Sequence, residues 1–81
     1  MKVTVKYSGH FCNLTGKKKE TVEMEGNGTL YRLFDALSGK YNNLPPLNEG
    51  LIYLVNGRIV KKEQVLVEGD EIQIFQMMAG G

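Results

Sequence analysis

The single helical pattern in this sequence is the feature that most limits its fold. Four large apolar residues occupy positions i, i+3, i+4 and i+7 of one helix face: Leu30, Leu33, Phe34 and Leu37. We expect Asn27 or Thr29 to cap the start of this helix, and Gly39, in a left-handed conformation, to end it, although Tyr41 would extend the stripe. One amphipathic helix cannot bury its stripe alone, so it needs a second layer to cover.

The other apolar segments have the alternation or short length that is typical of β-strands. Strands are predicted at residues 2–8, 21–24, 51–55, 58–60 and 71–77. Asn56-Gly57 is typical of a two-residue type I′ hairpin turn, because both residues tolerate positive φ. Loops or turns are predicted at residues 13–18, 42–50 and 68–70. Pro45-Pro46 forces an extended crossing in the second of these.

The order of these elements predicts a two-layer α+β domain. One main helix covers one face of a mixed sheet of four to five strands. The first and last strands are expected to lie side by side and parallel at the centre, because the segment with the helix supplies the long crossover. This is a β-grasp, or ubiquitin-like, arrangement. We assign residues 1–76 to the domain and residues 77–81 to a flexible C-terminal tail.

Composition argues against several classes of function. The chain has 81 residues and a net charge of +1, so it lacks the concentrated basic surface that nucleic acid requires. It has neither a membrane-spanning run nor a signal peptide, and we expect a cytoplasmic protein. Its one cysteine, Cys12, cannot form an internal disulfide. His10 and Cys12 offer two ligands, too few for a closed zinc site, so no metal is expected.

Three segments resemble the MoaD/ThiS family of ubiquitin-like sulfur carriers. They are the helix at residues 30–37, the strand and turn at residues 54–58, and the terminal segment. In the terminal segment, a strand after Gly69-Asp70 carries the aromatic Phe75 and leads to Ala79-Gly80-Gly81. The resemblance spans nearly the whole chain, and its length and first strand are most similar to the small subunit of molybdopterin synthase.

The resemblance implies a carrier with no catalytic residues of its own. An E1-like adenylating enzyme would use ATP and Mg to activate the carboxylate of Gly81, and a sulfur donor protein would convert it to a thiocarboxylate. The carrier itself would hold no permanent cofactor. Its acceptor would be the large subunit of molybdopterin synthase or another sulfur-accepting enzyme.

The tail residues have physical reasons for their identity. Gly80 lacks a Cβ, as Gly81 does, so the chain near Ala79 can pass through a narrow channel. Residues 76–81 reach roughly 20 Å when extended, but ordering them costs about 6–12 kcal/mol of backbone entropy. The domain must therefore supply binding energy elsewhere.

The predicted partner-binding residues are the ones that lead into the tail: Phe75, Gln76, Met77 and Met78. Alternation places Phe75 and Met77 on the outer sheet face, away from Ile72 and Ile74. An alternative interpretation places Phe75 in a small core beneath the loop that contains Pro45-Pro46.

The sequence leaves the sulfur acceptor open. Members of the molybdopterin branch often have prolines where this chain has Gln76-Met77-Met78. The main hypothesis is the molybdopterin synthase small subunit, in molybdenum cofactor biosynthesis. Alternatives are a carrier for thiamine thiazole, tRNA thiolation or amino-acid sulfur assimilation, and a β-grasp interaction module that is never activated. A Gly-Gly end can also be a plain disordered terminus.

Overall fold

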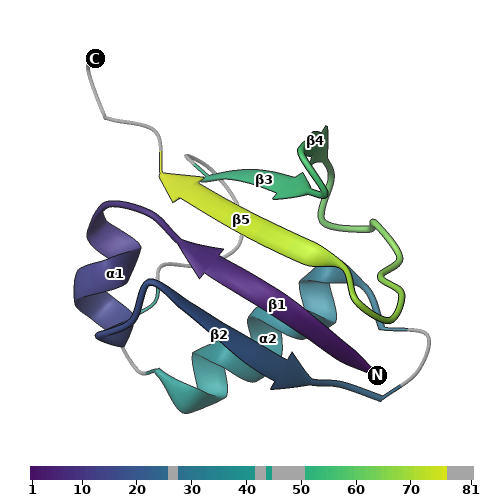
Figure 1. Cartoon of the computed structure of the whole chain (residues 1–81), viewed down its shortest axis with the longest axis horizontal. Helices are drawn as coiled ribbons and strands as arrows, with labels where there is room; N and C mark the ends of the chain where they lie inside the picture. Colours follow the sequence, from purple (N-terminus) through teal and green to yellow (C-terminus); the bar gives the residue numbers. More distant parts are fainter. Residues whose placement is uncertain (26–27, 42–43, 45–50, 77–81) are drawn as a thin grey trace.

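The computed structural model describes residues 1–25, 28–41, 44 and 51–76 (Figure 1). The elements, in chain order, are β1 (Lys2–Tyr7), α1 (His10–Thr15), β2 (Lys19–Glu23), α2 (Leu30–Lys40), β3 (Leu51–Val55), β4 (Arg58–Val60) and β5 (Glu71–Gln76). The strands form one five-stranded sheet in the order β2-β1-β5-β3-β4. The predicted loop at residues 42–50 lies outside the described residues, apart from Leu44.

The predicted strand pairing is confirmed. β1 pairs with β5 in parallel at the centre of the sheet, with Val5 beside Ile72. β2, β3 and β4 add antiparallel pairs on the two sides. Because β1 and β5 run in the same direction, β5 ends at the end of the sheet opposite to Met1 (Figure 1).

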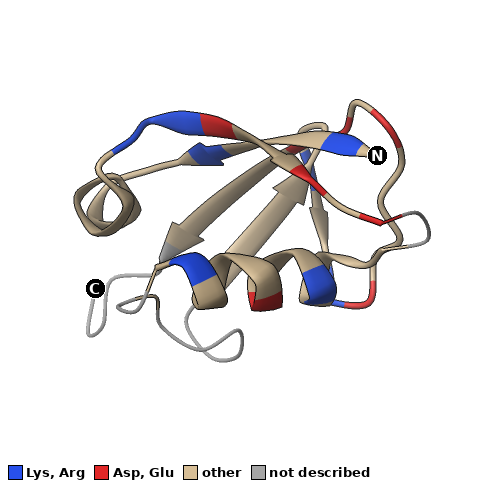
Figure 2. Cartoon of the chain, turned by 90° about the horizontal axis from the view of Figure 1, so that it is seen from below, with Lys and Arg blue, Asp and Glu red and all other residues tan. Residues whose placement is uncertain are grey.

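Helix α2 covers one face of this sheet, as Figure 2 shows. The whole predicted stripe is buried, with exposures of 0–2 % against the inner residues of the strands. Thr29 caps the helix, because its hydroxyl accepts a hydrogen bond from the Arg32 amide at 3.3 Å. The predicted end at Gly39 was wrong. The helix continues to Lys40, Tyr41 is the C-terminal cap, and Gly39 does not have a positive φ.

The short helix α1 was also missed, since residues 13–18 were predicted as a loop. Phe11 is fully buried in the core, and Gly16 ends the helix at φ 74°. A six-residue helix without a side-chain cap has little stability of its own, so contact with the sheet must stabilise it. None of the helices in the described ranges is long and apolar enough to cross a membrane.

A hydrogen-bonded cluster around Glu20 joins the end of α2 to β1 and β2. The Glu20 carboxylate is 7 % exposed and accepts hydrogen bonds from the Tyr7 hydroxyl at 2.5 Å and the Tyr41 hydroxyl at 2.6 Å. Lys40 Nζ donates to it at 2.7 Å, and Lys17 Nζ lies at 3.5 Å. These contacts explain why the helix extends past Gly39, because its last turn is tied to the sheet.

Two turns fix the opposite end of the sheet: Asn56-Gly57 between β3 and β4, and Glu68-Gly69 just before β5. Asn56 and Gly57 have φ values of 51° and 84°, which confirms the predicted type I′ turn between β3 and β4. Asn56 Nδ2 donates to Asp70 Oδ1 at 2.8 Å, and the Val67 amide donates to Asp70 Oδ2 at 2.8 Å. The buried Asp70 carboxylate therefore holds the start of β5 against this hairpin.

Candidate functional site

β5, the strand that precedes the predicted carrier tail, ends near the centre of one end of the sheet. Gln76 is the last residue of the strand, and its backbone lies beside Leu51 of β3. Helix α1 lies at the same end of the molecule, on the other side of β5 from β3 (Figure 1). β5 therefore ends between two fixed elements, β3 and α1.

Phe75 lies on the outer face of the sheet, as predicted. Its strand neighbours Ile72 and Ile74 are buried to 0–1 % exposure in the core, whereas Phe75 is half-buried. Directly beside Phe75 lies Ile52 of β3, also half-buried. Side chains in directly opposed pairs lie on the same face. Phe75 is therefore outside the main core, which disfavours the alternative interpretation for the residues that the structure describes.

Three further apolar side chains join Phe75 on this face, and sequence reasoning missed them. We call the set the outer patch: Ile52, Leu54, Ile59 and Phe75. Leu54 is paired with Ile59 of β4 and with Gln73 of β5. The missed signal was the uninterrupted apolar run of β3, because apolar residues at every position place such side chains on both faces of a strand.

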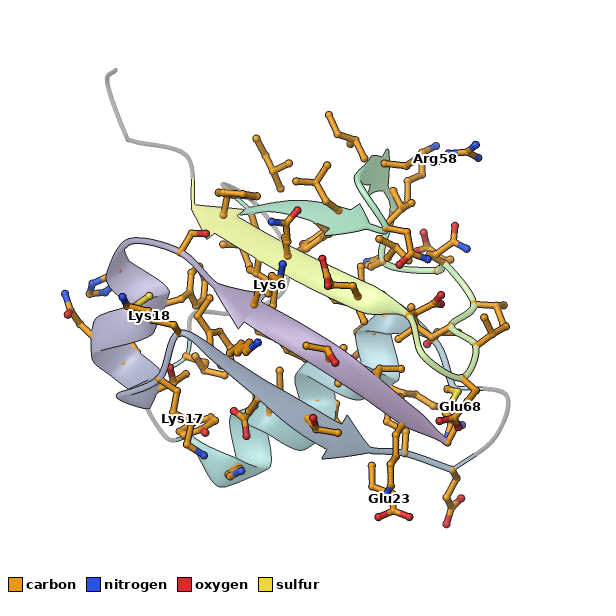
Figure 3. All side chains as sticks on the ribbon, viewed as in Figure 1. Lys6, Lys17, Lys18, Glu23, Arg58 and Glu68 are labelled. Carbon is orange, nitrogen blue, oxygen red and sulfur yellow. The ribbon has the colours of Figure 1, made fainter. Side chains whose placement is uncertain are left out.

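The other half of the outer face is polar. Lys6 of β1 and Glu71 of β5 form an ion pair of 3.0 Å, with side chains that are 40 % and 47 % exposed. Figure 3 shows Lys6 over the centre of the sheet on the side without α2. The outer face thus has an apolar half next to the point where β5 ends, and a charged half toward β2. An exposed pair of this kind contributes little stability, so it is free to meet a polar partner surface.

The remaining predicted site residues are in the tail. Met77, Met78, Ala79, Gly80 and Gly81 lie outside the described residues, and for Gln76 only the backbone is described. Their assigned roles therefore stay predictions.

Among the residues that the structure describes, Cys12 and His10 are not grouped with further metal ligands. Cys12 Sγ is half-buried and donates a hydrogen bond to the Tyr7 carbonyl oxygen at 3.1 Å, while His10 is exposed. Within the described ranges, no three His, Cys, Asp or Glu side chains are grouped so that they could hold a metal ion.

This sheet order, with one main helix on one face, defines a β-grasp domain of the ubiquitin-like class. The model of the ThiS family matches residues 5–81. The chain therefore belongs to the ThiS family of small ubiquitin-like carrier proteins. No curated protein sequence matches it significantly.

Solved structures share the fold at low sequence identity. SAMP1 of Haloferax volcanii is 21 % identical over 100 % of both chains, with a TM-score of 0.86. A Pyrococcus furiosus protein described as molybdopterin converting factor, subunit 1, is 24 % identical over 96 % of this chain and 99 % of its own, with a TM-score of 0.84. The Amycolatopsis orientalis BexX/CysO complex matches at 25 % identity over 98 % and 99 %, with a TM-score of 0.74.

Proposed function

We propose that this chain is a sulfur carrier that uses the carboxylate of Gly81 as its reactive group. The observation that carries the proposal is the family match over residues 5–81 together with a central strand, β5, that ends at Gln76, directly before the Gly-Gly segment of the sequence. The domain is not itself an enzyme in this proposal. It presents a tail that other proteins modify and read.

The chemistry needs three steps. A carboxylate oxygen of Gly81 attacks the α-phosphorus of ATP on the activating enzyme, which forms the acyl-adenylate and releases pyrophosphate. A sulfur nucleophile from a persulfide donor then attacks the acyl carbon, and AMP leaves with the oxygen. A thiol reductant then cleaves the S–S bond of the resulting acyl disulfide and is itself oxidised to a disulfide, which releases the donor thiol and leaves Gly81 with a thiocarboxylate. Without side chains at Gly80 and Gly81, the acyl carbon stays accessible to both reagents.

The outer patch offers the binding energy that the tail lacks. Ordering five tail residues costs about 5–10 kcal/mol of backbone entropy. Complete burial of four large apolar side chains is worth at most about 6–12 kcal/mol, and less here because three of them are already half-buried. A partner must therefore cover most of the outer patch to hold the tail in an active site. We expect the activating enzyme and the sulfur acceptor to compete for this surface.

Intact-mass analysis tests the carrier function. The protein is incubated with an E1-like adenylating enzyme, ATP, Mg²⁺ and a persulfide donor under reducing conditions. We expect the exchange of one oxygen for one sulfur in the full chain and in Cys12→Ser, and no exchange after deletion of Gly81. Unchanged thermal unfolding of the deletion variant is the control for folding. A mass increase of one whole sulfur atom in the full chain, absent in Cys12→Ser, would instead place the sulfur on Cys12. That result would contradict the proposal.

For the sulfur acceptor, we propose the large subunit of molybdopterin synthase, so that this chain is the small subunit in molybdenum cofactor biosynthesis. The length, the first strand and the likeness to the Pyrococcus furiosus protein support this acceptor. The test presents the thiocarboxylate form to molybdopterin synthase large subunit with its pterin precursor, and to acceptors for thiazole, tRNA and cysteine synthesis in parallel. Sulfur transfer to one of the other acceptors alone would contradict the molybdopterin assignment and leave the carrier function intact.

A further inference from the structure

A second candidate interaction surface lies at the β4 edge of the sheet, away from the strand that leads to the tail. β4 is the last strand of the described sheet, and β3 is its only strand neighbour there. Val55 and Arg58 flank the two-residue turn and form the hydrogen-bonded pair of the hairpin. In antiparallel pairing the next pair, Leu54 and Ile59, is not hydrogen-bonded. The amide N–H and carbonyl of Ile59 therefore point outward from the sheet edge.

Two hollows flank this edge. The first has a volume of about 470 Å³ and lies between the inner side of β4 and residues 64–70, with Val60, Val65 and Val67 among its lining residues. The second, of about 390 Å³, lies where β4 ends and is lined by Ile52, Ile59 and Val60, among others. Hollows of this size accept several aliphatic side chains.

The edge is also unusually apolar for an exposed surface. Ile59 is 75 % exposed, Val65 56 % and Val67 60 %. They are three of the four large hydrophobic side chains that are exposed in the described part of the chain. A natural sheet edge is normally protected against pairing, so exposed aliphatic side chains beside outward-facing backbone groups indicate that this edge binds something.

The charge of the edge indicates what binds. Arg58, Lys61 and Lys62 are all exposed, and none of them forms an ion pair with a carboxylate in the described ranges. Figure 3 shows Arg58 projecting away from the body of the domain at β4. Of the described residues that line the second hollow, Glu63 is the only acidic one, beside Lys61 and Lys62, so the described cations are in excess there. Edge lysines can simply prevent aggregation, but these also complement carboxylates on an added strand.

We propose that the β4 edge binds an extended segment of a partner protein that has alternating aliphatic residues flanked by acidic residues. The segment lies beside β4 as a sixth strand, its backbone pairs with Ile59, and its alternate side chains enter the first hollow. Its carboxylates face Arg58, Lys61 and Lys62. Of the outer patch, this strand pairing uses only Ile59, and β3 separates the edge from β5, the strand that leads to the tail. The carrier can therefore be held by the β4 edge while the tail remains free.

The test uses the full chain and the synthetic peptide acetyl-Asp-Val-Thr-Val-Thr-Val-Glu-amide. Affinity is measured by amide chemical-shift titration at low salt, and hydrogen exchange of the Ile59 amide is followed in the unmodified protein. We expect the peptide to shift the amides of residues 58–62 and to slow exchange at Ile59. Ile59→Pro removes the outward N–H, and we expect it to weaken binding about tenfold or more, whereas Ile59→Thr retains the N–H and binds within about threefold of the unmodified chain.

Matched charge variants test the electrostatic part. We expect Lys61→Glu to weaken peptide binding about tenfold, while Lys18→Glu, the same charge change at the opposite end of the molecule (Figure 3), has little effect. Equal affinity for Ile59→Pro and Ile59→Thr, peptide-induced shifts confined to Phe75 and Leu54, or unchanged exchange at Ile59 would each overturn the proposal. The exchange measurement needs no variant, so it holds even if Ile59→Pro does not fold.

Discussion

The buried Glu20 carboxylate makes the stability of this small domain depend on pH in a way that one substitution can isolate. Burial alone would raise the pKa of Glu20, but hydrogen bonds from Lys40, Tyr41 and Tyr7 outweigh burial and lower the pKa from 4.5 to about 2. Burial, together with the hydrogen bond to Glu20 and its charge, raises the pKa of Tyr7. The cluster therefore keeps the Glu20 carboxylate charged and the Tyr7 hydroxyl protonated near neutral pH.

The size of the effect follows from the pKa shift. A fall from 4.5 to about 2 corresponds to about 3 kcal/mol of stability, at about 1.4 kcal/mol per pKa unit. Because the pKa is lower in the folded state, this stability is present above pH 4.5 and is lost as the pH falls toward about 2. The loss is large for a domain of this length, whose total free energy of unfolding is on the order of 4–12 kcal/mol.

The assay is urea unfolding of the unmodified protein and Glu20→Gln between neutral pH and about pH 2, followed by far-ultraviolet circular dichroism. We expect Glu20→Gln to lower the free energy of unfolding at neutral pH by about 3 kcal/mol, and the difference between the two proteins to shrink by most of that amount at about pH 2. Glu23→Gln, on the same strand but exposed, is the matched control and should change stability by less than about 0.5 kcal/mol. A difference that stays constant across this pH range would refute the reasoning.

Two further substitutions separate binding from folding. Phe75→Ala should cost about 1–2 kcal/mol of stability, because the ring is only half-buried, yet weaken capture by the activating enzyme more than about tenfold; a collapse of stability in thermal unfolding would instead place Phe75 among the core residues. Asp70→Ala should cost about 2 kcal/mol or more, because it leaves the Asn56 amide and the Val67 N–H without their acceptors. Asp35→Ala, which changes an exposed residue of α2, is the control for Asp70→Ala. If both substitutions lowered the free energy of urea unfolding by the same small amount, the Asp70 hydrogen bonds would not stabilise the fold as argued.

Local sequence patterns were enough to predict most of the sheet and its one long helix. The stripe from Leu30 to Leu37 fixes which helix face is buried, and alternation fixes the inner face of β1 and β5. Asn56-Gly57 specifies its turn because positive φ is a property of the residues themselves. The outer position of Phe75 followed from the same alternation, since it depends only on its neighbours along the strand.

Tertiary structure decided the features that depend on distant partners. α1 forms because Phe11 enters the core. α2 continues past Gly39 because Lys40 and Tyr41 donate hydrogen bonds to Glu20, which lies on β2. The outer patch exists only once β3 pairs with β5 and β4 pairs with β3, which places Ile52, Leu54 and Ile59 on the same face as Phe75. Sequence alone thus predicted a reactive tail and four partner-binding residues before it, of which Phe75 is the one whose side chain the structure describes. The surface that can offset the cost of ordering that tail arises from strand pairing, which joins residues that are far apart in the chain.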